Sequence, residues 1–227
     1  MYLKYSGMAK NQSTEDYIKG IYKLQATGKG VSTSSLARHL KIEDGSVTGM
    51  LKKLSGKKLI VYTPYKGVVL TRSGTKLALQ MLRRHRLWEM FLVRYLDYRW
   101  DEIHDEAEHL EHVTSASMER RLDKALGHPK FDPHGDPIPS AQGEVPGMLH
   151  RTLSVCVPGE SVVIVQVDDE QEILKHLSSL GLRLGQKLAI TNVLAYDGSV
   201  TVKDGRKEHF LSRKVAEAIH VRDFHRQ

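Results

Sequence analysis

Cysteine is almost absent from this chain of 227 residues, which contains a single one, Cys156. One thiol excludes a disulfide framework and any metal site built only from thiolates, and it fits a reducing compartment. Long hydrophobic runs are absent too, because no stretch approaches the roughly 18 apolar residues of a membrane span. The start of the chain, "MYLKYSGMAK", lacks the apolar segment of a signal peptide. We therefore expect a soluble, cytoplasmic protein with no membrane partner.

The composition is that of a globular protein with a basic balance. Hydrophobic residues make up 40% of the chain and charged residues 27%, which is enough apolar material for a buried core. The formal net charge of +7 favours a polyanionic partner. The length predicts two or three small units.

Residues 1–76 predict a winged helix-turn-helix domain. Three successive stretches have apolar residues at helical spacing: "STEDYIKGIYKLQ", "VSTSSLARHLKI" and "EDGSVTGMLKKLSGKKLI". We expect the first helix to begin at an N-cap on Ser13 or Thr14. The following "LIVYTPYKGVVLT" reads as two β-runs around a turn, and this order of elements is that of a winged helix.

The remainder predicts a helical domain over 77–145 and a small β-domain over 146–227. "SGTKLALQMLRRHRLWEMFLVRYL" is a long apolar-periodic helix that leaves the first domain. Residues 127–147 concentrate five of the seven prolines and are typical of a linker. After them come short β-type runs such as "SVVIVQV" and "KLAITNVL". The predicted fold class is mainly α with β.

The second helix of a helix-turn-helix presents its N-terminal residues to base edges in the major groove. Here that segment contains small residues, which permit close approach, and lysines nearby supply charge for phosphates. The alternative is a protein-binding winged helix whose charged face is only solvated. The candidate DNA-binding residues are Ser34, Gly45, Ser46, Thr48, Gly49, Lys52, Lys53 and Lys66.

Candidate metal ligands gather in "HDEAEHLEH", residues 104–112. On a helix, His104, Glu108, Glu111 and His112 share one stripe, because residues three and four apart are neighbours. A set of imidazole and carboxylate ligands suits Mn²⁺ or Fe²⁺ better than it suits a softer ion that prefers thiolate ligands. The alternative is a solvated acidic helix. A carboxylate-bridged di-metal enzyme would need Glu-x-x-His motifs on two helices, which the stripe lacks, so we expect no enzyme.

The chain resembles the diphtheria toxin repressor and manganese transport regulator family of metal-dependent transcriptional regulators. The likeness runs through "TEDYIKGIYKL", "SVTGMLKKL", "YKGVVLTRSGTKLA", "RRHRLWEMFL", "HDEAEHLEHVTS" and "GDPIP", followed by a C-terminal β-domain. The resemblance implies a winged helix, a helical dimerisation domain with two metal sites and, in longer members, an SH3-like barrel. It also implies a homodimer that binds palindromic operator DNA when Mn²⁺ or Fe²⁺ acts as corepressor, and no small-molecule substrate.

Carried over from the family, the primary site consists of Asp16, Glu108, Glu111 and His112, and the ancillary site of His85, Glu89, His104 and Gln166. Iron-type members have Met and Cys where this chain has Asp16 and Glu108, so the resemblance favours Mn²⁺, with Fe²⁺ as the alternative.

Several positions depart from the family pattern. The second carboxylate that some manganese regulators use falls on Lys19, which puts a binuclear site in doubt. Val163 and Gln166 stand where iron-type members use Glu and Gln on the ancillary metal, so we expect a weaker contact there, or one through Asp168 or Asp169.

An anion site of iron-type members uses an Arg with a Ser and an Asn, but here Asp132 and Asp136 accompany Arg86, so no bound anion is expected. In the metal-free protein, the like charges of Asp16, Glu108 and Glu111 are expected to hold two helices apart until a cation joins them. A remaining alternative is a winged-helix regulator that senses a small molecule independently of metal.

Overall fold

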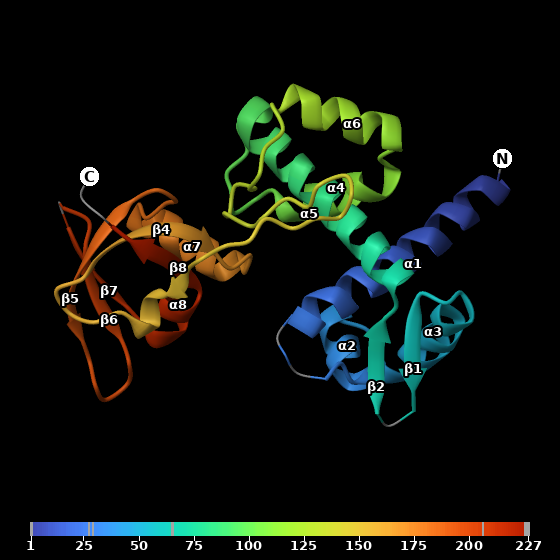
Figure 1. The fold of residues 1–227 in the computed structure, drawn as a ribbon, viewed down its shortest axis with the longest axis horizontal. Coiled ribbons are helices and arrows are strands. Elements are labelled where there is room, and N and C mark those ends of the chain that lie inside the picture. Colours follow the sequence, from blue (N-terminus) through green and yellow to red (C-terminus); the bar gives the residue numbers. More distant parts are fainter. Residues whose placement is uncertain (1, 27, 29, 65, 206, 225–227) are drawn as a thin grey trace. The chain divides into compact units, whose positions relative to one another are not determined.

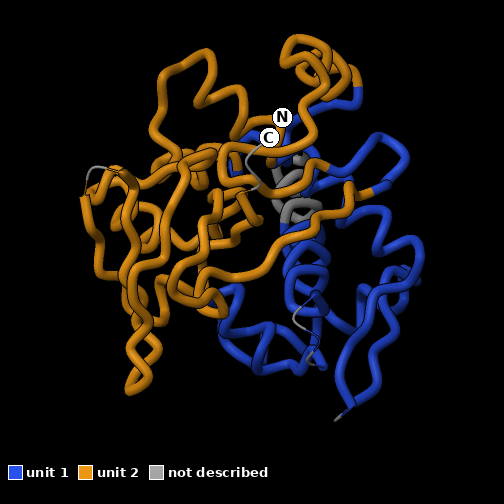
Figure 2. The backbone as a smooth tube through the Cα atoms, turned by 60° about the vertical axis from the view of Figure 1, so that its left-hand side comes forward, with its two compact units in different colours: residues 1–85, 108–116, 139–144 blue, residues 86–107, 117–138, 145–227 orange. Residues whose placement is uncertain are grey.

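The computed structural model describes residues 2–26, 28, 30–64, 66–205 and 207–224, with side chains from residue 13 onward. The chain folds into two compact units, coloured in Figure 2. Unit 1 consists of residues 1–85, 108–116 and 139–144, and unit 2 of residues 86–107, 117–138 and 145–227. The units share the segment expected to form one helical domain, because the long helix α4 (Arg72–Leu96) contributes residues to both.

Unit 1 contains the winged helix, and its element order is helix, helix–turn–helix, hairpin as predicted (Figure 1). The elements are α1 (Tyr2–Ala26), α2 (Thr33–Leu40), α3 (Asp44–Gly56), β1 (Ile60–Thr63) and β2 (Gly67–Leu70). The two strands pair antiparallel, with Ile60 opposite Leu70. The apolar residues of the three helices and of the hairpin meet in one core. This core includes Ile18 of α1, Leu36 of α2 and Leu51 of α3.

The N-terminal ends of the first two helices test the N-caps predicted from the sequence. Helix α2 begins at Ser32, whose hydroxyl accepts from the Ser35 amide in a capping box, as the Ser/Thr-rich sequence predicts. The expected cap at Ser13 or Thr14 is wrong, since both residues lie inside α1. No proline interrupts residues 2–12, so the helix continues toward the N-terminus.

Unit 2 combines helices with an antiparallel sheet. It holds the second part of α4, the start of α5 (His104–Val113) and most of α6 (Ala116–Ala125). The β-domain follows with β3 (Arg151–Thr152), a 3-10 turn (Leu153–Val155), β4 (Ser161–Val167), α7 (Gln171–Leu180), β5 (Lys187–Val193), β6 (Val200–Lys203), β7 (Glu208–Leu211), α8 (Arg213–Glu217) and β8 (Ile219–Asp223). The strand order is β3-β8-β4-β5-β6-β7, and all pairs are antiparallel. This confirms the small C-terminal β-domain.

The proline-rich segment makes defined contacts within unit 2. The Val167 amide donates to the His134 carbonyl at 2.9 Å, so the segment lies against the end of β4. Gly135 has a φ of +87°, and a Cβ there would lie 2.1 Å from the Val165 carbonyl oxygen. Only glycine permits this approach. The contact places His134 beside the residues that follow β4.

The described helices include none that is both long enough and apolar enough to cross a bilayer.

Candidate metal centres and DNA-binding face

The four residues expected at the primary site come together in unit 1. Asp16 lies on α1, and Glu108, Glu111 and His112 project from one stripe of α5. One ligand atom from each lies within 4.8 Å of the others. We call these four residues the primary cluster. Glu111 is fully buried, whereas Glu108 is about one-third exposed at its side chain.

Lys19 compensates the charge of the primary cluster. Its ammonium donates to Glu108 Oε2 and to Glu111 Oε1, both at 2.6 Å, and the residue is only 5% exposed. Burial lowers the Lys19 pKa, but the charges of Glu111 and Glu108 outweigh this and raise it, so the side chain stays cationic. The expectation that like charges hold α1 away from α5 is therefore wrong. A cation of the chain already joins the two helices.

His112 carries the second positive charge of this cluster. Its Nδ1 lies 2.7 Å from Glu15 Oε2 and its Nε2 lies 2.9 Å from Asp16 Oδ1. Burial lowers the His112 pKa, but the carboxylates of Asp16, Glu15 and Glu111 outweigh burial and raise it from 6.5 to about 9. The ring is thus an imidazolium at neutral pH, and a metal ion at Nε2 would replace a proton.

The donor set fits a divalent cation. Asp16 Oδ1 and His112 Nε2 are buried and face one another, yet neither has a well-aligned hydrogen bond within the described part of the chain. Buried polar atoms in native proteins normally have partners, so such a pair is typical of ligand atoms without their ion. Three carboxylates and one imidazole, without sulfur, suit Mn²⁺ or Fe²⁺.

His85, expected at the ancillary site, lies beside the primary cluster. Its Nδ1 is 2.5 Å from Glu111 Oε2 and 3.6 Å from Glu108 Oε2. Glu111 is therefore held on one oxygen by Lys19 and on the other by His85. In unit 1 His85 orients Glu111, a role that the i, i+4 spacing to Glu89 did not indicate.

Unit 2 contains a second group of possible ligands. Glu89, Asp132 and His134 are all buried, with ligand atoms within 4.8 Å of one another. Asp169, just beyond β4, places Oδ1 3.9 Å from His134 Nδ1 and Oδ2 2.9 Å from His104 Nδ1. We call these five residues the second cluster. Glu89 and His104 were expected there; Asp132 and His134 were not, although "DPHGD" is rich in possible ligands.

The contacts of His134 determine which of its nitrogens faces the acids. Its Nε2 lies 2.7 Å from the Trp100 carbonyl oxygen, which can only accept, so Nε2 carries a hydrogen and Nδ1 is the nitrogen that faces the acids. Nδ1 lies 3.9 Å from Glu89 Oε1. Burial, with the charges of Glu89 and Asp136, raises the Asp132 pKa well above its ordinary value, although Arg86 opposes this. A cation would relieve that repulsion.

Gln166 has a different partner from the one expected. Its amide donates to Asp136 Oδ1 at 2.9 Å, and the Arg86 guanidinium lies 3.4 Å from the same oxygen. Arg86 also lies 3.4 Å from Asp132 Oδ2. Arg86 thus lies beside two carboxylates, and the absence of a bound anion stays a prediction. Asp169, named as an alternative, is the residue of the β-domain that lies in the second cluster.

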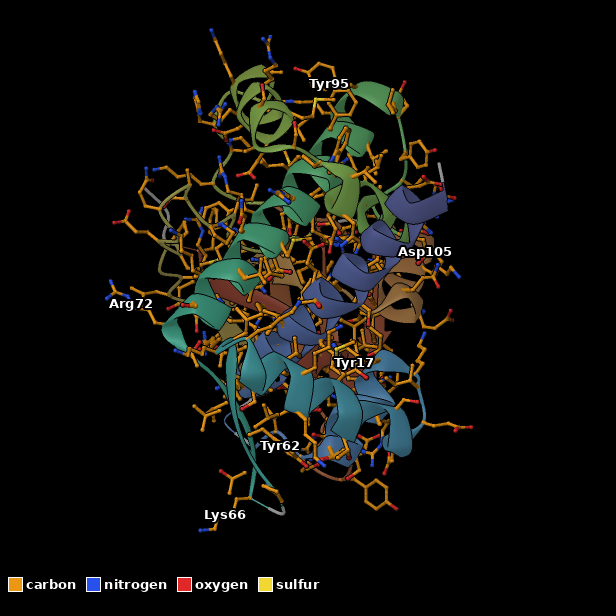
Figure 3. The ribbon with its side chains drawn as sticks, turned by 90° about the vertical axis from the view of Figure 1, so that its right-hand side faces the viewer. Tyr17, Tyr62, Lys66, Arg72, Tyr95 and Asp105 are labelled. Carbon is orange, nitrogen blue, oxygen red and sulfur yellow. The ribbon has the colours of Figure 1, made fainter. Side chains whose placement is uncertain are left out.

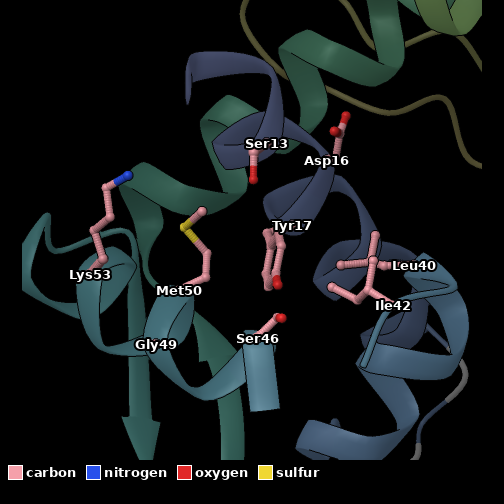
Figure 4. Close-up of a pocket in the computed structure, with 9 residues that line it drawn as sticks. All are labelled: Ser13, Asp16, Tyr17, Leu40, Ile42, Ser46, Gly49, Met50 and Lys53. Carbon is pink, nitrogen blue, oxygen red and sulfur yellow. The ribbon is translucent and has the colours of Figure 1, made fainter. Parts of the chain in front are cut away.

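The eight candidate DNA-binding residues line two hollows on either side of α3. A hollow of about 770 Å³ between α2, α3 and the hairpin is lined by Ser34, Gly45, Thr48, Lys52 and Lys66, among others. A second, of about 660 Å³ between α1 and α3, is lined by Ser46, Gly49 and Lys53 and has Asp16 at its rim (Figure 4). Lys66 lies at the tip of the hairpin, beyond Tyr62 (Figure 3).

Gly45 and Gly49 are exposed, and a Cβ at either position would meet nothing within 4 Å. The packing of unit 1 therefore does not require glycine there. Glycine in a helix costs about 0.5–1 kcal/mol relative to alanine, so a contact outside the unit is the better explanation. Close approach of a DNA backbone or base edge is such a contact.

The comparisons with known proteins agree with this geometry. Residues 11–68 match the family described as "Iron dependent repressor, N-terminal DNA binding domain", and residues 71–140 match "Iron dependent repressor, metal binding and dimerisation domain". The iron-dependent repressor IdeR of Mycobacterium tuberculosis is 35% identical over 223 residues, covering 92% of this chain and 96% of that protein. The chain belongs to the iron-dependent repressor family.

Other relatives of the family include both iron and manganese regulators. The diphtheria toxin repressor of Corynebacterium diphtheriae is 27% identical over 93% of this chain and 97% of its own length. A solved "Manganese-dependent transcriptional repressor complex with manganese" is 36% identical, with a TM-score of 0.86 over 93% of this chain and 100% of that one. The manganese regulator SloR is 32% identical, with a TM-score of 0.78 over 93% and 98%.

Residues 151–223 match the FeoA domain, which accounts for the C-terminal sheet. Family membership confirms the resemblance found in the sequence. The protein is a metal-dependent, DNA-binding transcriptional repressor and not an enzyme.

Proposed function

We propose that the protein is a manganese-responsive repressor of metal-uptake genes, with Mn²⁺ as corepressor. The observation that carries the proposal is the primary cluster, in which Asp16, Glu108, Glu111 and His112 converge without any sulfur ligand. Hard oxygen ligands suit Mn²⁺, whereas thioether and thiolate favour softer, later metals. The alternative is an iron-dependent regulator, which the 35% identity to IdeR supports.

The ligand sets are part of the proposal. Asp16, Glu108, Glu111 and His112 would hold the primary ion, and Glu89, His134 and Asp169, with Asp132 or His104, would hold a second one. A bound cation supplies positive charge that the carboxylates of α1 and α5 share. Asp16 and His112 gain most, because Lys19 already serves Glu108 and Glu111.

We propose that α1 is the element through which metal affects DNA binding. Asp16 lies in the primary cluster and also at the rim of the hollow lined by Ser46, Gly49 and Lys53 (Figure 4). Tyr17, the next residue, lines the same hollow. An ion held by Asp16 thus fixes the part of α1 that borders the recognition helix α3.

The active form is proposed to be a homodimer on a palindromic operator in the cytoplasm. Unit 2 exposes large apolar side chains on and after α4, with Tyr95 51% and Leu96 52% exposed, and Met118 on α6 is 46% exposed. Exposed apolar groups of this kind fit a self-association surface. A two-fold dimer would place two copies of α3 on two half-sites.

The test is DNA binding by metal-stripped protein, titrated anaerobically with Mn²⁺ and separately with Fe²⁺. The probes are promoter fragments of metal-transport genes, and the variants are wild type and Asp16→Met/Glu108→Cys. We expect wild type to require Mn²⁺ and the double variant to shift its preference toward Fe²⁺. Full-strength binding in chelator would refute the corepressor role, and a wild-type preference for Fe²⁺ would favour the iron-dependent alternative.

A further inference from the structure

Glu15, the residue before Asp16 on α1, contacts a proposed ligand but is not itself in the primary cluster. Its Oε2 lies 2.7 Å from Nδ1 of His112, and the His112 side chain is only 6% exposed. The Glu15 side chain is 20% exposed, so the contact is shielded from most solvent. Solvent and salt therefore weaken this ion pair less than they weaken one on an open surface.

An imidazole binds a metal ion through one nitrogen, and the partner of the other nitrogen determines which one is available. In His112, Nδ1 lies against Glu15, while Nε2 points to Asp16 at 2.9 Å and to Glu111 at 3.7 Å. The nitrogen left for a metal ion is thus the one that faces the carboxylates of the primary cluster.

The second cluster has the same arrangement with a different partner. There the Trp100 carbonyl accepts from Nε2 of His134, and Nδ1 faces Glu89 and Asp169. In each cluster one ring nitrogen is held by an acceptor outside the ligand set. In the first, that acceptor is a side chain that can be replaced.

We propose that Glu15 is the positioning residue of the primary metal centre: its carboxylate holds the hydrogen on Nδ1 of His112 and thereby presents the Nε2 lone pair to the ion. The proposal rests on the proposed function, because it requires that His112 be a ligand. Glu15 and Asp16 are adjacent on α1. A single turn of this helix therefore supplies both the ligand Asp16 and the carboxylate that orients the ligand His112. Helix α1 thereby contributes two residues to metal affinity, Asp16 as a proposed ligand and Glu15 as the group that positions His112.

Carboxylate partners of ligand histidines also raise the basicity of the ring, and losing such a partner typically lowers metal affinity about 10- to 100-fold. Glu15→Gln keeps an acceptor for Nδ1 and removes the charge, whereas Glu15→Ala removes both. We therefore expect a graded loss, smaller for Glu15→Gln than for Glu15→Ala.

The experiment measures Mn²⁺ binding calorimetrically in the full-length chain for wild type, Glu15→Gln, Glu15→Ala and His112→Gln. Glu106→Ala is the matched control, since it removes an exposed carboxylate from α5. We expect Glu15→Ala to weaken one class of Mn²⁺ site about 10- to 100-fold and Glu106→Ala to leave both classes unchanged. Saturating Mn²⁺ should restore DNA binding by Glu15→Ala to the wild-type level.

A second readout follows the ring itself. In protein loaded with diamagnetic Zn²⁺ and labelled with ¹⁵N at histidine, wild-type His112 should show a hydrogen on Nδ1 and a metal at Nε2. Glu15→Gln should keep this pattern and Glu15→Ala should lose it. The Glu15→Gln variant keeps the test valid even if Glu15→Ala disturbs α1.

The outcomes separate the two proposals. If His112→Gln lowers Mn²⁺ affinity while both Glu15 variants bind Mn²⁺ like wild type, the positioning role is refuted and the proposed metal centre stands. If His112→Gln also binds Mn²⁺ like wild type, His112 is no ligand, and the primary centre proposed above fails together with the role of Glu15.

Discussion

Replacing Lys19 with methionine tests the reasoning about charge at the primary cluster. Lys19→Met keeps an unbranched apolar stem but removes the ammonium that lies 2.6 Å from both Glu108 and Glu111. Removing one member of a buried ion pair typically costs 3–5 kcal/mol, because the remaining charge is left without compensation. Glu108 is about one-third exposed and partly screened, so we expect a loss near the lower end, about 3 kcal/mol.

The loss should be confined to metal-free protein. Saturating Mn²⁺ would supply the missing positive charge, so the difference between variant and wild type should shrink to about 1 kcal/mol or less. The two units need not unfold together, and hydrogen exchange in peptides of α1 and α5 is therefore the appropriate assay. In chelator, a loss of about 3 kcal/mol corresponds to roughly a hundredfold faster exchange through local opening.

Lys23→Met, one turn later on α1, is the matched control and should change exchange little in either condition. Equal exchange of Lys19→Met and wild type in chelator would show that the ammonium contributes no net stability. A large loss that Mn²⁺ does not reduce would show that Lys19 acts through packing rather than through the charge of Glu108 and Glu111.

Three further predictions concern Gly49, Gly135 and Cys156. Gly49→Ala should stabilise α3 by about 0.5–1 kcal/mol, measured by hydrogen exchange in peptides of α3, because alanine favours a helix more than glycine does. It should weaken operator binding about tenfold in a gel-shift assay, because the added methyl group faces open space where DNA must approach closely. Equal operator affinity would remove the argument for contact at this position. Gly135→Ala should abolish Mn²⁺ binding at the second cluster, because the added Cβ would lie 2.1 Å from the Val165 carbonyl oxygen and push His134 away. An unchanged number of Mn²⁺ ions bound per chain, measured by calorimetry, would contradict this. Cys156 should resist a thiol reagent at pH 8, because burial raises the pKa of its thiol to about 11. The unfolded thiol ionises near pH 9, so the free energy of unfolding should fall as pH rises between these two values. Rapid labelling of folded protein at pH 8 would contradict the raised pKa.

Local patterns predicted the elements of the primary cluster. The stripe formed by Glu108, Glu111 and His112 follows from helical spacing alone, and α5 forms where the sequence indicated. The pairing of Asp16 with that stripe came from the family resemblance, since two ligands nearly a hundred residues apart share no local signal. The start of α1 was missed because capping residues also occur inside helices.

Long-range contacts explain what the sequence did not reveal. His134 and Asp132 lie in a segment without periodicity. Contacts distant in sequence, among them the bond from the Val167 amide to the His134 carbonyl, bring them beside Asp169. The role of Lys19 was missed for another reason. A lysine at a family position of a carboxylate reads as a lost ligand. In three dimensions its ammonium supplies positive charge to Glu108 and Glu111.

The absence of sulfur from both clusters has a consequence for redox chemistry. Peroxide converts a methionine ligand to the sulfoxide and a cysteine thiolate to the sulfenic acid, and either change destroys a metal site. Here Asp16 and Glu108 stand at those positions and are inert to such oxidants. The single thiol, Cys156, is buried in the β-domain outside both clusters. The ligands proposed for this repressor therefore offer peroxide no sulfur atom to oxidise.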